Sequence, residues 1–208
     1  TVFLGLVFLL LGCHAVPILK KAFDSKNYEK RLRRLRYNPD IFQALLNNNP
    51  LITKSIDGVG LVVGNPQATT ELIKVCNPYC DPCSKAHLHL EEIIKGNPDV
   101  KIRIIFTASG EDEDIKTAPV AHLLAVQDKQ GQAGVEQALN DWYLASRKDY
   151  GPFAAKYPMN GEIKAQKEKI IAMRNWCNDM KIRATPTLFI NGRELPEGYA
   201  ISELKNFF

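Results

Sequence analysis

Three of the five cysteines in this chain lie within eight residues, in the stretch VCNPYCDPCSKAH at residues 75–87. Cys76, Cys80 and Cys83 have the spacing CxxxCxxC, and His87 follows one helical turn after Cys83. Cysteines clustered in this way indicate redox or metal chemistry rather than a disulfide scaffold. The stretch suits an iron–sulfur cluster, a zinc ion or a thiol–disulfide pair, and each makes different demands on the rest of the chain.

The two metal alternatives demand more than the chain provides. An iron–sulfur cluster on CxxxCxxC is typical of radical enzymes that split S-adenosylmethionine, but those are partial barrels with several further βα units. Zinc bound by Cys76, Cys80, Cys83 and His87 would suit the metal's preference for thiolate and imidazole ligands. Structural zinc ligands, however, normally come from two separate knuckles. A non-catalytic zinc module is therefore kept as the alternative function.

The thiol–disulfide interpretation needs only the CxxC pair. Pro82 and the apolar spacing after it predict a helix that begins at this pair. Free backbone N–H groups and the helix dipole stabilise a thiolate at such a position, and a second cysteine two residues later can close a disulfide. We therefore predict that Cys80 is the nucleophile and Cys83 the resolving thiol. The carboxylate of Asp81 should disfavour the Cys80 thiolate and make the pair less oxidising.

The elements around the pair predict an α/β domain. Apolar runs rich in β-branched residues indicate strands, periodic apolar positions indicate helices, and the Asn-Gly pair at 191 and 192 indicates a hairpin. In chain order the predicted elements are strands 60–64 and 70–76, helix 82–96, strand 100–107, a helical block over 117–180 broken near Gly131, strands 186–190 and 193–199, and a final helix over 201–208 capped by Ser202. The cysteine pair thus lies at a strand-to-helix junction.

The N-terminal residues differ in character from this domain. Residues 1–19 are almost continuously apolar and predict a transmembrane helix. The alternative is a lipoprotein signal with LLGC as its cleavage box and Cys13 as the lipidated residue. Residues 20–57 form a basic juxtamembrane linker, which favours a cytoplasmic side, whereas a disulfide-forming pair needs an oxidising compartment. Residues 58–208 form the compact domain.

The composition limits the classes of partner. The 208 residues, 45% of them hydrophobic, suffice for one ordinary domain with an appendage. The net charge of +4 is too small to indicate a nucleic-acid partner, and we predict none.

The sequence resembles the thioredoxin superfamily in two motifs. YCDPC after a strand looks like the active-site motif of that family, and ATPT at residues 184–187 looks like its cis-proline loop. The resemblance covers residues 58–208 and implies a thioredoxin-like fold with a helical insertion, as in periplasmic disulfide oxidoreductases. By this resemblance Pro186 is the cis-proline and Thr185 is the residue whose backbone pairs with a bound peptide.

A closer resemblance is to the thioredoxin-like domain fused behind bacterial vitamin K epoxide reductase homologues, through segments such as DWYLASRKDYGPFAAKYPMNGEI and TPTLFINGRELPEGY. It implies that cysteine-containing substrate proteins and a vitamin K epoxide reductase-like membrane domain are the partners. Electrons would pass through that membrane domain to quinone, and the soluble domain would bind no cofactor. It also implies that residues 1–19 are the last helix of that membrane domain. The domain would lie in the bacterial inner membrane, with the soluble domain facing the periplasm.

Three other residues carry smaller predictions. Cys177 has helical apolar spacing around it, which predicts a buried structural thiol. The alternative is that Cys177 and Cys76 form a second disulfide. Lys74 falls near the position of a buried acid in thioredoxins, but on an alternating strand we expect it to face solvent.

Overall fold

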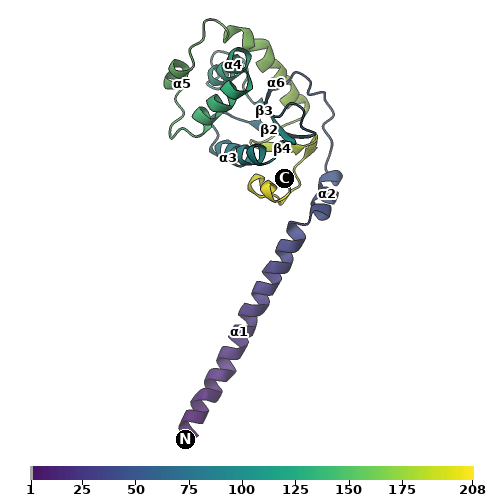
Figure 1. Ribbon diagram of the computed structural model, residues 1–208, viewed down its shortest axis with the longest axis vertical. Coiled ribbons are helices and arrows are strands. Elements are labelled where there is room, and N and C mark those ends of the chain that lie inside the picture. The colour runs from purple at the N-terminus through teal and green to yellow at the C-terminus, as the bar shows by residue number, and fades with distance from the viewer. Residues whose placement is uncertain (1) are drawn as a thin grey trace. The chain divides into compact units, whose positions relative to one another are not determined.

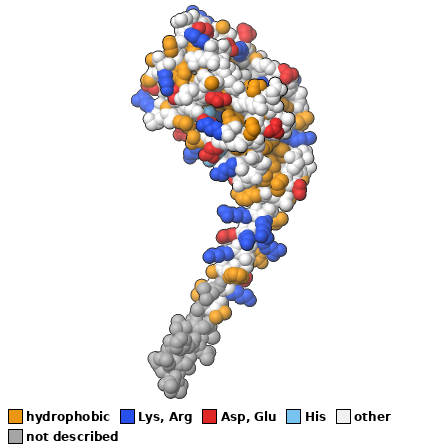
Figure 2. All heavy atoms as spheres, viewed as in Figure 1, with side chains coloured by type: hydrophobic (Ala, Val, Ile, Leu, Met, Phe, Trp, Pro, Cys, Tyr) orange, Lys and Arg blue, Asp and Glu red, His pale blue; other side chains and the backbone are white. Residues whose placement is uncertain are grey.

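The computed structural model describes the backbone of residues 2–208 and the side chains of residues 16, 18 and 20–208 (Figure 1). The contacts divide the chain into two units, one ending at Leu45 and the other spanning Leu46–Phe208. The first unit contains α1 (Val2–Arg36) and most of α2 (Pro39–Asn48). The lysine and arginine side chains of residues 20–36 line α1 (Figure 2).

The predicted transmembrane segment, residues 1–19, lies outside the described side chains except for residues 16 and 18, and Cys13 lies outside them too. No helix among the described residues combines the length and the hydropathy that a membrane span needs. The predicted basic linker is largely helical, since α1 continues through its first part and α2 follows.

The second unit is built on a five-stranded mixed sheet with the strand order β1-β3-β2-β4-β5 (Figure 1). β2 and β3 are parallel, and every other neighbouring pair is antiparallel. The strands are β1 (Leu61–Gly64), β2 (Thr70–Cys76), β3 (Val100–Phe106), β4 (Thr187–Ile190) and β5 (Arg193–Glu194). The other elements are α3 (Asp81–Gly96), α4 (Thr117–Tyr143), α5 (Tyr150–Lys156), a short 3₁₀ helix η1 (Lys164–Gln166), α6 (Lys167–Asp179) and η2 (Ile201–Asn206).

Helices cover both faces of the central strand β2. Lys74 pairs with Leu188 of β4, and both side chains lie on the face covered by α3. Ile73 pairs with Phe189 on the opposite face, where the Phe189 ring packs edge-on against Trp176 of α6. Because both faces are covered, residues 72–76 are all buried instead of alternating between core and solvent.

The edge strand β1 is covered by side chains of α4. Gln127 donates to the carbonyl of Val62 at 3.2 Å, and Gln132 donates to the carbonyl of Gly64. Glu136 accepts from the N–H of Gly64 at 3.3 Å. These bonds pair backbone groups that an edge strand would otherwise expose.

α4 is bent within its length. The break expected near Gly131 is a kink at that residue, whose φ of 69° and ψ of −160° lie outside the helical region. A positive φ of this kind suits glycine, which has no Cβ.

The C-terminal hairpin forms around Asn191 and Gly192, as predicted, with φ values of 47° and 80°. Its second strand has only two residues, shorter than predicted, because the chain turns away at Pro196. The predicted C-terminal α-helix is a 3₁₀ helix, and its first turn is capped by Glu203, which accepts from the N–H of Ala200, instead of by Ser202.

Residues 46–57, placed in the linker by the sequence, belong to the second unit through their contacts with this hairpin. The guanidinium group of Arg193 donates to the carbonyls of Asn47 and Asn49 at 2.9 and 2.7 Å. The N–H of Ile52 donates to the carbonyl of Gly192 at 2.8 Å. The segment before residue 58 is therefore tied to the β5 edge of the sheet.

Candidate functional site

Cys80 lies at the junction between β2 and α3, where the sequence places it. It is the N-cap residue of α3, with extended backbone angles (φ −79°, ψ 124°), and Pro82 follows in the first turn. The Cys80 carbonyl accepts from the backbone N–H of Ser84 at 3.2 Å, the first bond of the helix. Cys80 therefore lies at the N-terminus of α3, where the backbone N–H groups of the first turn have no carbonyl partner within the helix.

The turn before Cys80 is held from two directions. Asn77 accepts from the N–H of Tyr79 through its side chain at 2.9 Å and from the N–H of Cys80 through its carbonyl at 3.2 Å. From α4, the buried indole of Trp142 donates to the carbonyl of Pro78 at 2.8 Å, and its ring contacts that of Tyr79 edge-on. The turn that carries Cys80 is therefore held by α4 as well as by its own strand.

The cis-proline loop meets the cysteine pair directly. The Thr185–Pro186 peptide bond is cis, as the resemblance to thioredoxins implies. The Cys80 thiol donates to the carbonyl oxygen of Thr185, with Sγ 3.6 Å from the oxygen. The fold thus brings together Cys80, Thr185 and Pro186, which lie more than a hundred residues apart in the sequence.

The two cysteines of the pair have different environments. Cys80 is partly exposed, whereas Cys83, one turn into α3, has no exposed surface. Burial, with a further contribution from the neighbouring Cys76, raises the pKa of Cys83 to about 12. This asymmetry suits an accessible thiol that meets the substrate and a protected thiol that acts second.

Cys76 ends β2 behind the pair and is completely buried. Its Sγ lies 3.0 Å from the hydroxyl oxygen of Tyr143, and burial raises the pKa of the Cys76 thiol. Its backbone carbonyl accepts from both the N–H and the hydroxyl of Thr107, which follows β3.

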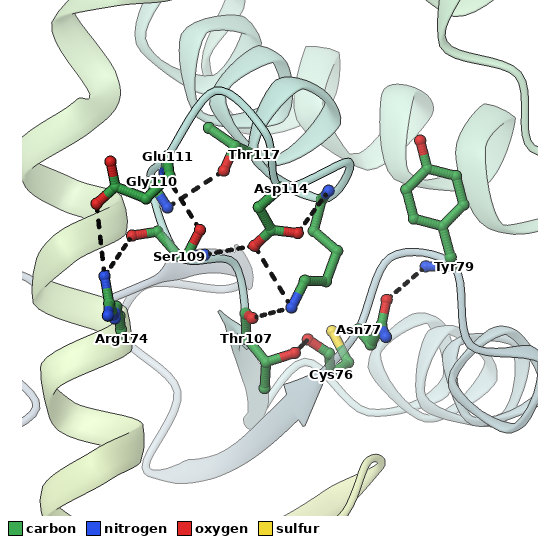
Figure 3. A network of polar contacts seen from close by, with 11 residues as sticks. Cys76, Asn77, Tyr79, Thr107, Ser109, Gly110, Glu111, Asp114, Thr117 and Arg174 are labelled. Atoms are coloured by element: carbon green, nitrogen blue, oxygen red, sulfur yellow. Dashed lines mark hydrogen bonds and ion pairs between the residues drawn. The ribbon is translucent and has the colours of Figure 1, made fainter.

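A polar network continues from Thr107 into the acidic loop after β3 (Figure 3). Lys116 donates to the carbonyl of Thr107 at 2.8 Å, and Asp114 accepts from the N–H groups of Ser109 and Lys116. Arg174 of α6 donates to the carbonyl of Ser109 at 3.3 Å. The loop therefore braces the strand end at Cys76 and is itself anchored to α6.

His87 is held by α4, where its ring packs against that of Tyr143 with the centroids 5.0 Å apart. Its Nε2 lies 2.7 Å from Oδ1 of Asn140, whose Nδ2 donates to Glu91 at 2.6 Å. Since the amide nitrogen faces Glu91, Oδ1 accepts and the imidazole Nε2 carries the proton. Burial lowers the pKa of His87 to about 4, so the ring is neutral at pH 7.

This arrangement does not favour the zinc alternative. Cys76 faces Tyr143, Cys80 faces Thr185 and His87 faces Asn140, so the four proposed donors do not converge. Within the described part of the chain, no three histidine, cysteine or acidic side chains form a group able to hold a metal ion.

One expectation about a charged residue is wrong, and the expected effect of Asp81 stays a prediction. Lys74 does not face solvent: its side chain has no exposed surface, because α3 covers that face of β2. The side chain of Asp81 is 89% exposed, and its Oδ1 lies 3.7 Å from Nζ of Lys148. Solvent and this ammonium group both weaken the effect of Asp81 on the Cys80 sulfur.

The second disulfide stays a prediction. Among the described residues, Cys76, Cys80, Cys83 and Cys177 are free thiols. Cys177 lies on α6 and is buried, as expected for a structural thiol, and burial raises its pKa to about 11.

A groove of about 580 Å³, which the sequence did not reveal, begins beside the pair. It runs between α3, β4 and η2, and its apolar lining includes Pro82, Ala86, Pro186, Leu188 and Ile201. Because Pro186 belongs to both the groove wall and the cis-proline loop, a chain lying in the groove would pass close to Cys80.

Comparison with known proteins extends these observations. Residues 57–208 match the family model described as Thioredoxin, and no curated protein sequence matches the chain. The fold is similar to that of oxidised BdbD from Bacillus subtilis, with a TM-score of 0.57, 14% identity and coverage of 77% of this chain and 94% of the other. It is also similar to ScsC from Proteus mirabilis in a transitional conformation, with a TM-score of 0.59 and 16% identity. That match covers 89% of this chain and 95% of ScsC. A third match is a periplasmic thioredoxin-like protein from Salmonella enterica serovar Typhimurium, with a TM-score of 0.56 and 15% identity. It covers 80% of this chain and 93% of the other.

Proposed function

Because the chain belongs to the thioredoxin family, we propose that it is a thiol–disulfide oxidoreductase whose working pair is Cys80 and Cys83. The observation that carries this proposal is the contact between Cys80 and the cis-proline loop. The nucleophile lies at a helix N-terminus, partly exposed, with its sulfur 3.6 Å from the carbonyl of Thr185. A substrate sulfur that approaches Cys80 would therefore lie beside the cis-proline loop. The backbone of this loop can form hydrogen bonds with the backbone of the substrate chain.

In the proposed reaction the Cys80 thiolate attacks one sulfur of a substrate disulfide and forms a mixed disulfide. Cys83 then attacks the Cys80 sulfur, closes the Cys80–Cys83 disulfide and releases the substrate as a thiolate. The opposite direction uses the same steps in reverse. Thr185 and Pro186 position the substrate chain, and the groove beside Pro186 receives its apolar side chains.

The resemblance to fusion proteins supports a finer proposal. The chain would exchange electrons with a vitamin K epoxide reductase-like membrane domain, which would use quinone, and would face the periplasm of a bacterial inner membrane. An oxidising compartment suits a chain whose predicted function is disulfide exchange.

The variant Cys83→Ala tests the proposed function. Without the resolving thiol, the mixed disulfide on Cys80 has no internal attacker and should accumulate. We expect incubation with a disulfide-containing peptide to give a stable adduct, which mass spectrometry of tryptic fragments locates on Cys80.

The double variant Cys80→Ala, Cys83→Ala is the matched control. Cys13, Cys76 and Cys177 remain in both variants, so only the adduct at residue 80 should be lost. The absence of an adduct on Cys80 in Cys83→Ala would contradict the assignment of Cys80 as nucleophile.

A further inference from the structure

The positive charge of this chain is concentrated on one exposed helical segment. Residues 20–36 of α1 hold eight lysine and arginine side chains against two acidic ones, Asp24 and Glu29, which gives this basic segment a net charge of +6. Because the whole chain has a net charge of +4, the remaining residues together carry −2. Every residue of the basic segment is exposed, and its lysines and arginines line α1 (Figure 2).

The basic segment also exposes large apolar side chains. Tyr28, Leu32 and Leu35 are 66%, 63% and 57% exposed. Their spacing of four and three residues places them on one side of the helix, where they form a continuous apolar stripe. Exposed apolar side chains that adjoin one another in this way mark a surface that another molecule covers.

Basic side chains lie directly beside this stripe. Arg31 precedes Leu35 by four residues, and Lys21 precedes Tyr28 by seven, so both fall on the side of the helix that carries the stripe. Lys20, eight residues before Tyr28, borders the same side. A partner that covers the stripe therefore meets positive charge at its border, and negative charge on the partner would complement it.

An anionic membrane surface fits both features. Leucine and tyrosine side chains of an interfacial helix enter the boundary between headgroups and acyl chains, while flanking lysines and arginines extend to the lipid phosphates. Each basic side chain near a negatively charged leaflet adds to the attraction. Nucleic acid would match the charge but leave the stripe uncovered. A second copy of the helix would match the stripe but bring +6 against +6.

We propose that the basic segment of α1 binds an anionic membrane surface, with Tyr28, Leu32 and Leu35 facing the acyl chains. The proposal does not rest on the proposed redox function, because no residue of the cysteine site takes part. It is also separate from the predicted span of residues 1–19. A span depends on the length of an apolar run, whereas this contact depends on the charge of the lipid headgroups.

The test measures the environment of the stripe in the whole chain. Leu32→Trp places an indole in the stripe at an exposed position, so the fold should not change. The protein is incorporated into vesicles of phosphatidylcholine, with or without about one phosphatidylglycerol in three lipids, and quenching of the indole by brominated acyl chains is measured. The buried Trp142 and Trp176 give a constant background, which is recorded with Leu32 intact. We expect quenching only with phosphatidylglycerol, and its loss at about 0.5 M salt, because salt screens the headgroup charge.

Charge variants identify the source of the attraction. In the Leu32→Trp protein, quenching at graded phosphatidylglycerol content gives an equilibrium constant for docking of the helix on the lipid. The triple change Lys20→Gln, Lys21→Gln, Arg31→Gln should lower this constant about a hundredfold, because three side chains that attract the anionic surface are lost.

Two matched controls separate position from composition. The triple change Lys164→Gln, Lys167→Gln, Lys205→Gln removes the same charge from exposed lysines of the second unit and should leave docking unchanged. For the stripe, Leu35→Gln should weaken docking about tenfold, because an apolar side chain no longer enters the lipid. Phe23→Gln makes a comparable change on another side of the helix and should have little effect.

Equal quenching with and without phosphatidylglycerol, or equal weakening by the two triple changes, would overturn the recognition of anionic lipid. The absence of quenching in both kinds of vesicle would overturn the contact itself, as expected if the segment binds nucleic acid instead. An indole emission that shifts to shorter wavelength without quenching would show that protein covers the stripe, and would also overturn the proposal.

Discussion

Cys80→Ser is expected to lower turnover in disulfide exchange by at least about a thousandfold, as loss of an essential nucleophile does in other enzymes. A serine hydroxyl at the N-terminus of α3 keeps the size and polarity of the thiol but cannot form a disulfide. The measurement is the steady-state reduction of a disulfide-containing peptide with excess dithiothreitol as the electron donor. Because Cys80 is partly exposed and at the helix N-cap, the substitution should leave the fold intact.

The matched control is Cys177→Ser, which makes the same chemical change on α6 outside the proposed site. It should keep wild-type turnover. Turnover by Cys80→Ser within about tenfold of the wild type would mean that another thiol performs the exchange, and would contradict the site proposed here.

Acidification is expected to destabilise the fold through buried His87. Its pKa is about 4 in the folded protein, below the ordinary value of 6.5, because the ring is buried against α4. Between these two values the unfolded chain binds a proton that the folded chain excludes, so stability falls as pH drops from 6.5 and levels off below 4. The difference in pKa corresponds to about 3 kcal/mol of unfolding free energy.

Urea denaturation over a series of pH values between about 7 and 4 measures this loss. His87→Gln, which keeps a donor toward Asn140 but does not titrate, should lose most of the dependence. A smaller loss of stability with falling pH should remain in His87→Gln, since burial also lowers the pKa of His122. Leu88→Gln introduces the same residue at the adjacent, exposed position and should keep the wild-type profile. Equal slopes in all three proteins would contradict the assignment of a buried neutral His87.

The sequence predicts the site well where local signals and chain order coincide. Pro82 marks the start of α3, and the strand before it ends at Cys76, so the position of Cys80 at a helix N-terminus follows from the residues alone. The Asn-Gly pair predicts the hairpin after β4 for an equally local reason, since both residues adopt a positive φ. Local signals do not predict the contact between Cys80 and Thr185. Only the resemblance to thioredoxins relates two residues so far apart in the chain.

Lys74 shows what local patterns miss. On a strand with one exposed face, a lysine between Ile73 and Val75 points to solvent, and this was the expectation. In the fold, β2 is the central strand and helices cover both faces, so the alternation of apolar and polar residues no longer reports exposure. Long-range packing decides such a position, and the strand order that creates the packing cannot be read from the strand itself.

Long-range packing also decides the contacts at the edge of the sheet. Gln127, Gln132 and Glu136 have no sequence signature that relates them to β1, yet their side chains pair its backbone. The groove beside Pro186 is likewise formed by α3, β4 and η2, which are distant in the chain. Local sequence therefore indicates the elements and the position of the cysteine pair, while the groove and the edge contacts depend on how distant elements pack together.

The central claim, that Cys80 and Cys83 are one redox pair, is tested most directly by equilibrating the wild-type protein in glutathione buffers of graded redox potential. The thiols are trapped by alkylation and the disulfides mapped by mass spectrometry. We predict that Cys80 and Cys83 are oxidised together, in a single two-electron transition, and are bonded to each other. A Cys76–Cys177 disulfide, if formed, would appear as a separate transition. Cys80 and Cys83 that stay free throughout, or that bond to other cysteines, would contradict the account.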